Sequence, residues 1–426
     1  MTTPPASPLA DPPEEPVRHR PGEHVIELLR RAHTRGADQP LDLGGRPALL
    51  ITEPATVRHV LARHPDSYVK RSHRARVLLG DGLIAVTGEQ WRTQRRVMQP
   101  HFTARNIRVF EPAMRRCAGR VARRWARSAE TGQPRDLVAD MRHFALDVIW
   151  SSMTGLPLEE ADHHDLLAAG RIVDALPAFA PDAPPGQADL AADLARVDDA
   201  AARAIAAARS HTGPSLLHPL LDAADQLPDP PERLVRDELV TLLVAGYETT
   251  AATLAWAFLL LDKHPDEHRR VLEAGPDGSP ERRAAIRAVL DETLRLYPTA
   301  WLLPRYATEP DTLAGHPVDA GTTLLLCPYL THRDPAVWPE PDGFRPGRFT
   351  SPNPRPTPGT YYPFGVGPRA CIGVHFSLHE MTILLEHLLP SFTPALHHPL
   401  PAPAFGITVH PDGPLHAHLH ATPTHG

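Results

Sequence analysis

The sequence predicts a mainly α-helical fold with a minor β region, organised around one long buried helix. Helical spacing of apolar residues recurs along most of the chain, whereas the alternation typical of strands is confined to short runs. The segment Glu232–Lys263 is apolar on nearly every face from Leu239 to Leu261, which is typical of a helix buried on all sides. No linker divides the chain, so we expect residues 22–426 to form a single domain after a proline-rich, disordered leader at residues 1–21.

The other elements follow from the same periodicity, and prolines mark several of their ends. The long helix begins after Asp229, a suitable N-cap, with Pro230 and Pro231 in its first turn. Pro298 and Pro390 end two later helices because proline does not continue a helix. In chain order we expect helices at His24–Arg35, Glu53–Arg63, Gln90–Met98, Ala104–Thr131, Val138–Met153, Asp162–Leu176, Glu232–Lys263, Ser279–Leu296 and Ile372–Leu389, and strands at Arg46–Ile51, Leu324–Pro328 and Leu415–Leu419.

Composition argues against several classes of function. The net charge of -6 gives no case for a nucleic-acid partner. The three cysteines, Cys117, Cys327 and Cys371, form no CxxC pair, so we expect neither a disulfide framework nor a zinc site. The chain shows no signal peptide and no run of about 18 apolar residues. We therefore expect a cytoplasmic protein without a membrane anchor.

The most specific segment runs from Phe364 to Gly373 and reads F-G-V-G-P-R-A-C-I-G. Its first glycines allow a tight turn with positive φ before Cys371. A helix is expected directly after Cys371, and its free N–H groups and dipole would lower the pKa of the thiol. Gly373 would let a flat ligand lie close to the backbone, Phe364 would shield the sulfur, and Arg369 would meet a carboxylate of that ligand.

This segment resembles the signature F-G-x-G-x-R-x-C-x-G of the cytochrome P-450 family and matches every fixed position, including Gly365. The resemblance implies a soluble, bacterial-type member whose long helix lies over haem b, with Cys371 as the axial ligand of the iron. It also implies a haem-dependent monooxygenase that uses O₂. An inert buried cysteine after a glycine-rich turn is the structural alternative.

Two further motifs follow in the family's order. The tetrapeptide from Glu292 to Arg295 resembles E-x-x-R, whose outer residues share one helix face. The hexapeptide at 344–349 resembles F-x-P-E-R-F, with Gly347 in place of the usual Glu. By this resemblance, Glu292, Arg295 and Arg348 form a structural cluster that holds the cysteine loop in place.

The long helix contains the run A-G-Y-E-T-T at residues 245–250. Polar groups in an apolar helix are costly to bury without partners. Gly246 and a Thr249 hydroxyl bonded back to a carbonyl indicate a local opening, although a satisfied polar kink is the structural alternative. The run resembles A-G-x-[DE]-T-T, which implies that Thr249 bonds iron-bound dioxygen, Glu248 helps deliver protons, and Ala245 and Gly246 lie beside the haem.

Trp91 and Arg95 share a helix face and resemble the family's W-x-x-x-R. The resemblance implies that both, together with Arg305, bind haem propionates; core packing and a surface ion pair are the alternatives. On the opposite side of this helix, Arg92 and Arg96 lie where the family docks an acidic ferredoxin or flavodoxin. A solvated basic face would look the same.

The redox supply follows from where the cysteine falls. Little chain remains after Cys371, since the sequence ends at Gly426. We therefore expect electrons from NAD(P)H to arrive through separate partners, a ferredoxin or flavodoxin with its reductase.

By the same resemblance, the substrate pocket is lined by the loop at 72–86, the segment at 172–179, the long helix, and two later turns. The apolar character of these segments favours a small-molecule substrate that is apolar and fairly bulky, such as a terpenoid or polyketide-derived secondary metabolite. We expect this substrate to be hydroxylated or epoxidised. Ring formation, C–C coupling or desaturation with the same haem-thiolate chemistry is the alternative interpretation. The pocket residues that we name are Leu242, Ala300, Leu302, Leu303 and Ile407.

Two other functions remain as rivals. Peroxide-driven relatives typically lack the acid–alcohol pair, which Glu248 and Thr249 preserve here. A haem-binding domain without catalysis is expected to lose Cys371 or Thr249, and both are present.

Overall fold

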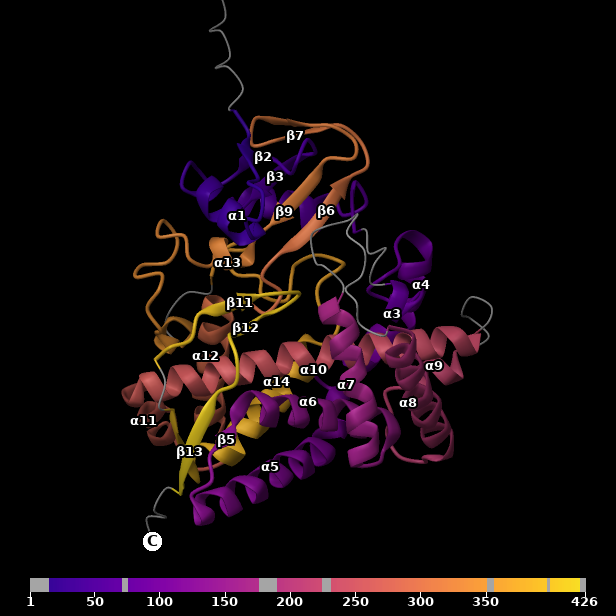
Figure 1. Cartoon of the computed structure of the whole chain (residues 1–426), viewed down its shortest axis with the longest axis vertical. Helices are drawn as coiled ribbons and strands as arrows, with labels where there is room; N and C mark the ends of the chain where they lie inside the picture. The colour runs from indigo at the N-terminus through magenta and orange to yellow at the C-terminus, as the bar shows by residue number, and fades with distance from the viewer. Residues whose placement is uncertain are drawn as a thin grey trace, which may run out of the picture.

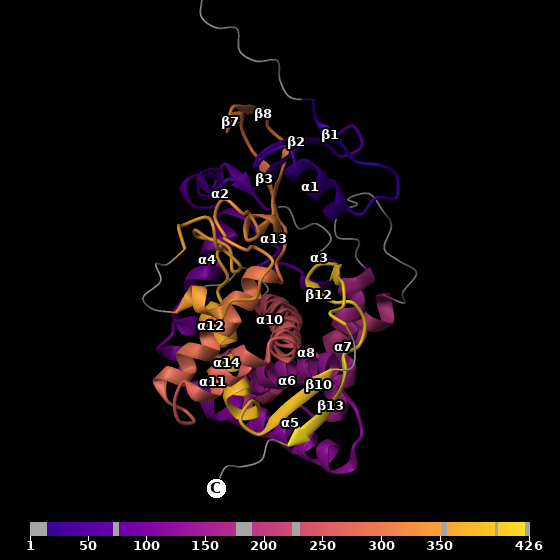
Figure 2. The same cartoon turned by 90° about the vertical axis from the view of Figure 1, so that its left-hand side faces the viewer.

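The computed structural model describes residues 15–70, 76–175, 190–223, 231–350, 356–396 and 399–421. A six-stranded sheet lies at one end of the molecule and helices fill the rest (Figure 1). Seen along the long helix α10 (Pro231–Lys263), the helices α6, α7, α8, α12 and α14 lie around it (Figure 2). The predicted class, mainly α with a minor β region, is confirmed.

The other helices in chain order are α1 Val25–His33, α2 Pro54–Arg58, α3 Arg76–Leu79, α4 Gly88–Met98, α5 Glu111–Thr131, α6 Leu137–Thr154, α7 Glu160–Ala175, α8 Leu190–Ser210, α9 His218–Asp222, α11 Pro265–Glu273, α12 Pro280–Leu296, α13 Pro328–Thr331 and α14 Val374–Leu388. Local signals explain several of their ends. The Asp136 carboxylate caps α6 by accepting from the Val138 N–H, and Ser279 caps α12 in the same way. Gly132 ends α5 in the left-handed region.

The strands are β1 Val17–Arg18, β2 Gln39–Asp42, β3 Pro47–Ile51, β4 Tyr68–Val69, β5 Arg135–Asp136, β6 Leu303–Ala307, β7 Asp311–Leu313, β8 His316–Val318, β9 Thr323–Leu326, β10 Phe392–Leu396, β11 Pro403–Phe405, β12 Val409–Pro411 and β13 His416–Ala421. The large sheet has the order β1-β2-β3-β9-β6-β4. Within it β9 is parallel to β3 and antiparallel to β6, and β4 pairs antiparallel with β6 at the edge of the sheet.

The helix α10 forms the centre of the helical part. It packs most extensively against α6 and also contacts α8, α12 and α14. Leu254, Trp256 and Phe258 are each at most 1% exposed. Burying an apolar side chain of this size stabilises the fold by about 1.5–3 kcal/mol. By length and composition α10 is also able to cross a membrane, but 72% of that apolar window is buried inside the protein.

Several predicted boundaries are corrected by the structure. The expected helix Ala104–Thr131 is a 3₁₀ turn at Asn106–Phe110 followed by α5, because Pro112 in the first turn starts a new helix. The expected helix at Ile372 begins two residues later at Val374. The expected strand Leu324–Pro328 ends at Leu326, since Pro328 opens α13. The helices α3, α8, α9, α11 and α13 were not predicted.

The structure bears on the expected leader at residues 1–21 and on the expected start of the long helix. The strand β1 pairs with β2, so Val17 and Arg18 inside the expected leader belong to the large sheet. The expected N-cap Asp229 and Pro230 lie outside the described residues, as do residues 1–14. In the tail strand, Leu415, Ala417 and Leu419 are buried, as their alternation predicts.

Candidate haem-thiolate site

The cysteine loop is a compact turn that delivers Cys371 to the start of α14. Its backbone closes through hydrogen bonds from Cys371 N to Phe364 O (2.8 Å) and from Ala370 N to Gly367 O (3.0 Å). Gly365 and Gly367 have φ of 69° and 78°, which side chains rarely adopt. A Cβ on Gly367 would also clash with the backbone of Leu61. The turn therefore requires glycine at this position for two independent reasons.

The Cys371 thiol is accessible but lies in a desolvating environment. Cys371 is exposed, whereas Cys117 and Cys327 are buried. The protein atoms around the sulfur nonetheless desolvate it, and this burial raises the pKa of the Cys371 thiol above its ordinary value. A hydrogen bond from the Gly373 backbone and the charge of Arg95 lower that pKa by less. The expected net lowering of the pKa is thus wrong, because Cys371 precedes the first residue of α14 by three positions and burial outweighs the helix terminus.

These two properties together bear on what the sulfur is able to bind. The side chain has accessible surface although many protein atoms surround it, so the sulfur is able to meet a ligand. A thiol with a raised pKa becomes a thiolate at neutral pH only when a cation such as a metal ion binds it. Cys371 is therefore suited to ligate a metal and is poorly suited to act as a free nucleophile.

Four cationic side chains gather beside the cysteine loop. Arg305 on β6 is 8% exposed, and its hydrogen bond goes to the neighbouring Pro304 O (2.8 Å). Burial, together with the charge of Arg369, lowers the pKa of Arg305 to about 10. Burial and the charges of Arg305 and Arg369 lower the pKa of Lys70 to about 7. Burial likewise lowers the pKa of Arg95 on α4.

Among the described residues, no carboxylate offsets the charge at the centre of this cluster. Only other cations shift the pKa of Lys70 and Arg305 besides burial, whereas Asp66 acts on Arg369 at the edge. Buried cations without an anion are costly. A ligand with a cationic metal at its centre and carboxylates at its rim meets both the sulfur and this cluster. The residues present therefore fit haem.

Trp91 and Arg369 pack together at the same place. The Arg369 guanidinium lies 4.2 Å from the centre of the Trp91 ring and donates to Val86 O (2.9 Å). The Arg95 guanidinium donates to the Gln99 side chain at 2.6 Å. The structure thus brings Trp91, Arg95, Arg305 and Arg369 together, with Lys70 as a member that the motifs did not indicate.

A compositional signal for Lys70 is present in the sequence. Basic residues are almost all arginine, and Lys70 and Lys263 are the two lysines of the chain. A rare lysine just before a predicted pocket loop is worth examining, but its convergence with Arg305 and Arg369 depends on the pairing of β4 with β6.

Replacing Lys70 with methionine tests its place in the cluster. We expect haem to leave the holoprotein roughly tenfold faster, since one charge-assisted hydrogen bond is lost. Transfer of haem to excess apomyoglobin measures this rate. Lys263→Met is the matched control, because Lys263 lies on the far end of α10 beside Asp262. Equal rates for wild type and Lys70→Met would remove Lys70 from the haem site.

On α10 the predicted polar residues are each paired. Thr249 Oγ1 donates to Ala245 O (2.8 Å), the expected back-bond. Glu248 accepts two hydrogen bonds from Arg142 of α6, at 2.8 and 3.1 Å. The helix is continuous through Gly246, whose nearest neighbour is Ile149, so the expected opening is not a break in the helix. The Arg142 partner comes from a separate helix and was not predicted.

A second acid, on α14, also contacts α10 and was not predicted from the sequence. Glu380 of α14 is 2% exposed and accepts from Thr250 Oγ1 (2.8 Å). Burial raises the pKa of the Glu380 carboxyl well above its usual range, and the hydrogen bond from Thr250 only opposes that rise. It connects α10 to the helix that follows Cys371. An acid within the apolar face of a predicted helix is the signal that would have found it.

The structural cluster assembles around a buried ion pair. Glu292 and Arg295 are both 0% exposed and joined at 2.7 and 2.9 Å. Arg348 Nε approaches Glu292 at 3.3 Å, so the three predicted residues meet. Gly347, which replaces the usual Glu of the motif, does not prevent this contact. Arg345 N also donates to Glu292 at 2.8 Å.

Three hydrogen bonds connect this pair to the cysteine loop. Arg295 donates to His332 O at 2.9 Å. The His332 ring accepts from Tyr362 N at 2.9 Å, and Tyr362 O accepts from Gly365 N at 2.9 Å. Burial and the charge of Arg295 lower the pKa of His332 to about 3, which keeps the ring neutral and able to accept. The ion pair therefore supports the turn that carries Cys371.

The predicted pocket residues differ in exposure. Leu242 and Leu302 are buried, at 7% and 8% exposed, and Ala300 and Leu303 are partly buried. Ile407 is 52% exposed on the turn after β11. Arg71, Arg74 and the segment 176–179 lie outside the described residues.

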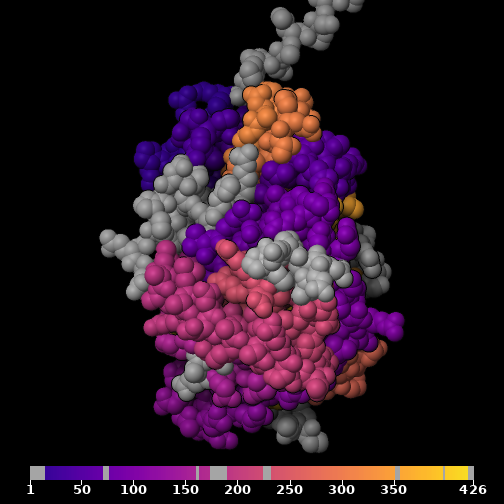
Figure 3. Space-filling view, turned by 90° about the vertical axis from the view of Figure 1, so that its right-hand side faces the viewer, coloured from indigo at the N-terminus to yellow at the C-terminus, as the bar shows by residue number. Residues whose placement is uncertain are grey.

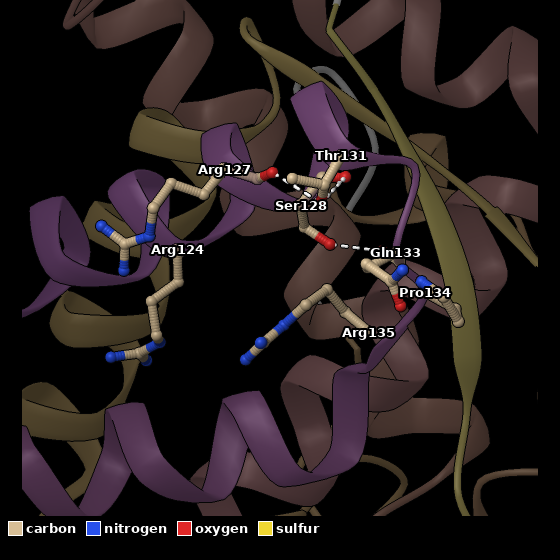
Figure 4. A pocket seen from close by; sticks show the side chains of 7 residues that line it. All are labelled: Arg124, Arg127, Ser128, Thr131, Gln133, Pro134 and Arg135. Atoms are coloured by element: carbon tan, nitrogen blue, oxygen red, sulfur yellow. Dashed lines mark hydrogen bonds between the residues drawn. The ribbon is translucent and has the colours of Figure 1, made fainter.

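A hollow of about 240 Å³ opens elsewhere, at the C-terminal end of α5 (Figure 4). Arg124, Arg127 and Arg135 line it together with Ser128, Thr131, Gln133 and Pro134. Asp140 already pairs with Arg135 and approaches Arg124 at 4.0 Å. None of its lining residues is a predicted site residue.

The amino-acid sequence is similar to those of several known proteins. The family model described as cytochrome P-450 matches residues 24–414. Cyclooctatin synthase of Streptomyces melanosporofaciens is 33% identical, covering 84% of this chain and 83% of the relative. The chloroplastic carotene epsilon-monooxygenase of Arabidopsis thaliana is 30% identical over 86% of this chain and 76% of its own.

Solved structures give the same result. A 6-coordinated cytochrome P-450 from Thermus thermophilus superimposes with a TM-score of 0.75 and 30% identity, covering 93% of this chain and 98% of that one. The haem domain of another cytochrome P-450 superimposes with a TM-score of 0.81 and 25% identity, over 94% of this chain and 92% of the other.

Proposed function

The chain belongs to the cytochrome P-450 family and is a monooxygenase of that family, and from this premise we propose that it hydroxylates or epoxidises a bulky apolar secondary metabolite of terpenoid or polyketide origin. The accessible thiol of Cys371 beside desolvated cations carries the haem part of the proposal. Leu242 and Leu302 support an apolar substrate. So does the plant relative named for carotene, which is an apolar terpenoid hydrocarbon.

Haem b is the cofactor of the family, and when bound it supplies the activation of O₂ with electrons from redox partners. We propose that Cys371 Sγ ligates its iron. Phe364, Gly365 and Gly373 would lie beside the ring from the cysteine loop, and Ala245 and Gly246 would lie beside it from α10. The residues proposed to hold the propionates are Lys70, Trp91, Arg95, Arg305 and Arg369.

Two residues of α10 are proposed to transfer protons to the site. The Thr249 hydroxyl donates its proton to Ala245 O, and rotation about χ1 would release that proton for a bound ligand. Glu248 is 21% exposed and bound to Arg142, so it reaches solvent on the α6 side. Release from Arg142 would let the Glu248 carboxylate take up a proton from solvent and pass it toward Thr249.

Removing the Thr249 hydroxyl tests this role. In Thr249→Ala holoprotein with a surrogate ferredoxin, its reductase and a substrate identified by spin-state shift, we expect product formed per NAD(P)H consumed to fall at least about tenfold. Hydrogen peroxide should account for the lost reducing equivalents. Thr253→Ala is the matched control, since Thr253 bonds a carbonyl one turn further along α10. Unchanged coupling in Thr249→Ala would contradict the proposed monooxygenase mechanism.

The face carrying the end of α4 is the proposed docking surface for an acidic ferredoxin or flavodoxin. Arg92 is largely neutralised, because it pairs with Asp66 at 2.9 Å and with Glu89 at 3.4 Å. Arg96 is exposed, and so are Arg105 and Arg108 on the following turns. We therefore propose that these three arginines, more than Arg92, attract the partner.

A further inference from the structure

The loop at 80–86, which connects α3 to α4, is held by consecutive side chains of α10. The Asp237 carboxylate accepts from Asp81 N at 2.9 Å. The Glu238 carboxylate accepts from Leu83 N at 3.1 Å. Both acids are almost fully buried, at 2% and 0% exposed. Side chains of a core helix thus take the place of backbone partners that an irregular loop cannot supply for itself.

The loop is packed against α10 without space for larger residues. Gly80 has φ of 50°, in the left-handed region. A Cβ on Gly80 would clash with the Asp237 carboxylate, and one on Gly82 would clash with the Thr241 hydroxyl. In Figure 3 the purple segment that contains α3 and α4 lies directly against the pink to salmon segment that leads into α10.

The far side of the same loop is attached to the haem-binding elements. Gln94 of α4 donates to Asp81 O at 2.8 Å, and α4 carries Trp91 and Arg95. Arg369 of the cysteine loop donates to Val86 O at 2.9 Å. The loop at 80–86 is therefore bonded to α10 on one side and to α4 and the cysteine loop on the other.

Stability alone does not account for the acid at position 238. Burial and the neighbouring Asp237 raise the pKa of Glu238 to about 8, so the side chain is largely neutral at pH 7. Arg236 neutralises Asp237 at 3.0 Å. The second Glu238 oxygen, the Thr241 hydroxyl and the Gln94 carbonyl oxygen are buried without partners among the described residues. Burying polar groups without partners costs free energy of folding. The contacts of Glu238 are therefore better explained by a role in specifying one position of the loop than by a gain in stability.

We propose that Asp237 and Glu238 are positioning residues that fix the loop at 80–86 between α10 and the cysteine loop and so determine the size of molecule admitted to the site. The proposal rests on the proposed function, since it assumes a haem beside Cys371. The loop contributes Leu83, Ala85 and Val86 to the core and Ile84, partly exposed, between them. A shift of the loop would move all four together.

The test measures size selectivity with two iron ligands, imidazole and the bulkier 4-phenylimidazole, titrated into the holoprotein. Glu238→Ala should change the ratio of the two Kd values by about fivefold, the equivalent of one lost hydrogen bond. Glu238→Gln should restore the wild-type ratio at pH 7, because its amide oxygen still accepts from Leu83 N. Glu232→Ala, at an exposed acid near the start of α10, is the control and should leave the ratio unchanged.

Gly82→Ala approaches the same loop from the other side and should alter the ratio in a variant that keeps both acids. Hydrogen exchange of the peptide at 79–86 should be faster in Glu238→Ala and Gly82→Ala than in wild type. If both variants keep the wild-type ratio, the acids are merely structural and the inference fails alone. If wild type lacks the red-shifted Soret band of a CO-bound haem thiolate, the proposed function fails and takes this inference with it.

Discussion

Holoprotein carrying Cys371→Ser should lose the red-shifted Soret band of the reduced, CO-bound form, together with all monooxygenase activity. The serine hydroxyl is nearly isosteric, so the turn closed by Phe364 O remains able to form. It does not ionise near neutral pH, however, and cannot supply the electron-rich ligand that thiolate provides. The absorption spectrum of the dithionite-reduced, CO-bound protein measures the change.

Cys117→Ser is the control for that experiment. Cys117 is 1% exposed between α5 and α6, where it accepts from Arg120 at 3.0 Å. Burial raises the pKa of the Cys117 thiol to about 12, so it has no role as an anion. This variant should keep the red-shifted band. A band that persists in Cys371→Ser would show that another residue ligates the iron.

Glu292→Gln should destabilise the protein by about 3–5 kcal/mol, because it leaves the charge of Arg295 buried without its partner. Arg295 is 0% exposed, and its other hydrogen bonds go to backbone oxygens, which do not neutralise it. The bonds from Arg295 through His332 and Tyr362 to Gly365 transmit the loss to the cysteine loop. Urea unfolding measures the stability, and haem content after gel filtration measures the loop.

Glu340→Gln is the matched surface control. Glu340 pairs with Arg345, but both side chains are more than half exposed, at 62% and 51%. An exposed pair contributes only about 0–1 kcal/mol. Similar losses in Glu292→Gln and Glu340→Gln would mean that the buried pair has no special role in holding the cysteine loop.

Features written in neighbouring residues were predictable from the sequence. The all-round apolar character of Leu239–Leu261 indicated the central helix, because a periodic pattern needs no knowledge of distant contacts. The glycines at 365 and 367 indicated the tight turn before Cys371, because positive φ is a local demand on the backbone. Family resemblance then related these local features to haem.

Partners brought together by the fold were not predictable in the same way. The acid Glu248 was found from its motif, but its pairing with Arg142 required the packing of α10 on α6. The direction of the Cys371 pKa was misjudged, since burial by distant segments exceeds the effect of the nearby helix end.

By itself, then, the sequence determined the mainly helical class, the buried central helix and the turn that presents Cys371, all of which depend on residues close together in the chain. Only the tertiary structure decided that Lys70 joins Arg305 and Arg369, and that Asp237 and Glu238 hold the loop at 80–86. These are contacts between segments more than 150 residues apart in several cases, such as the bond from Leu83 N to Glu238. Their formation depends on how helices and strands pack, because hydrogen bonds and charges act over distances in space and not along the chain.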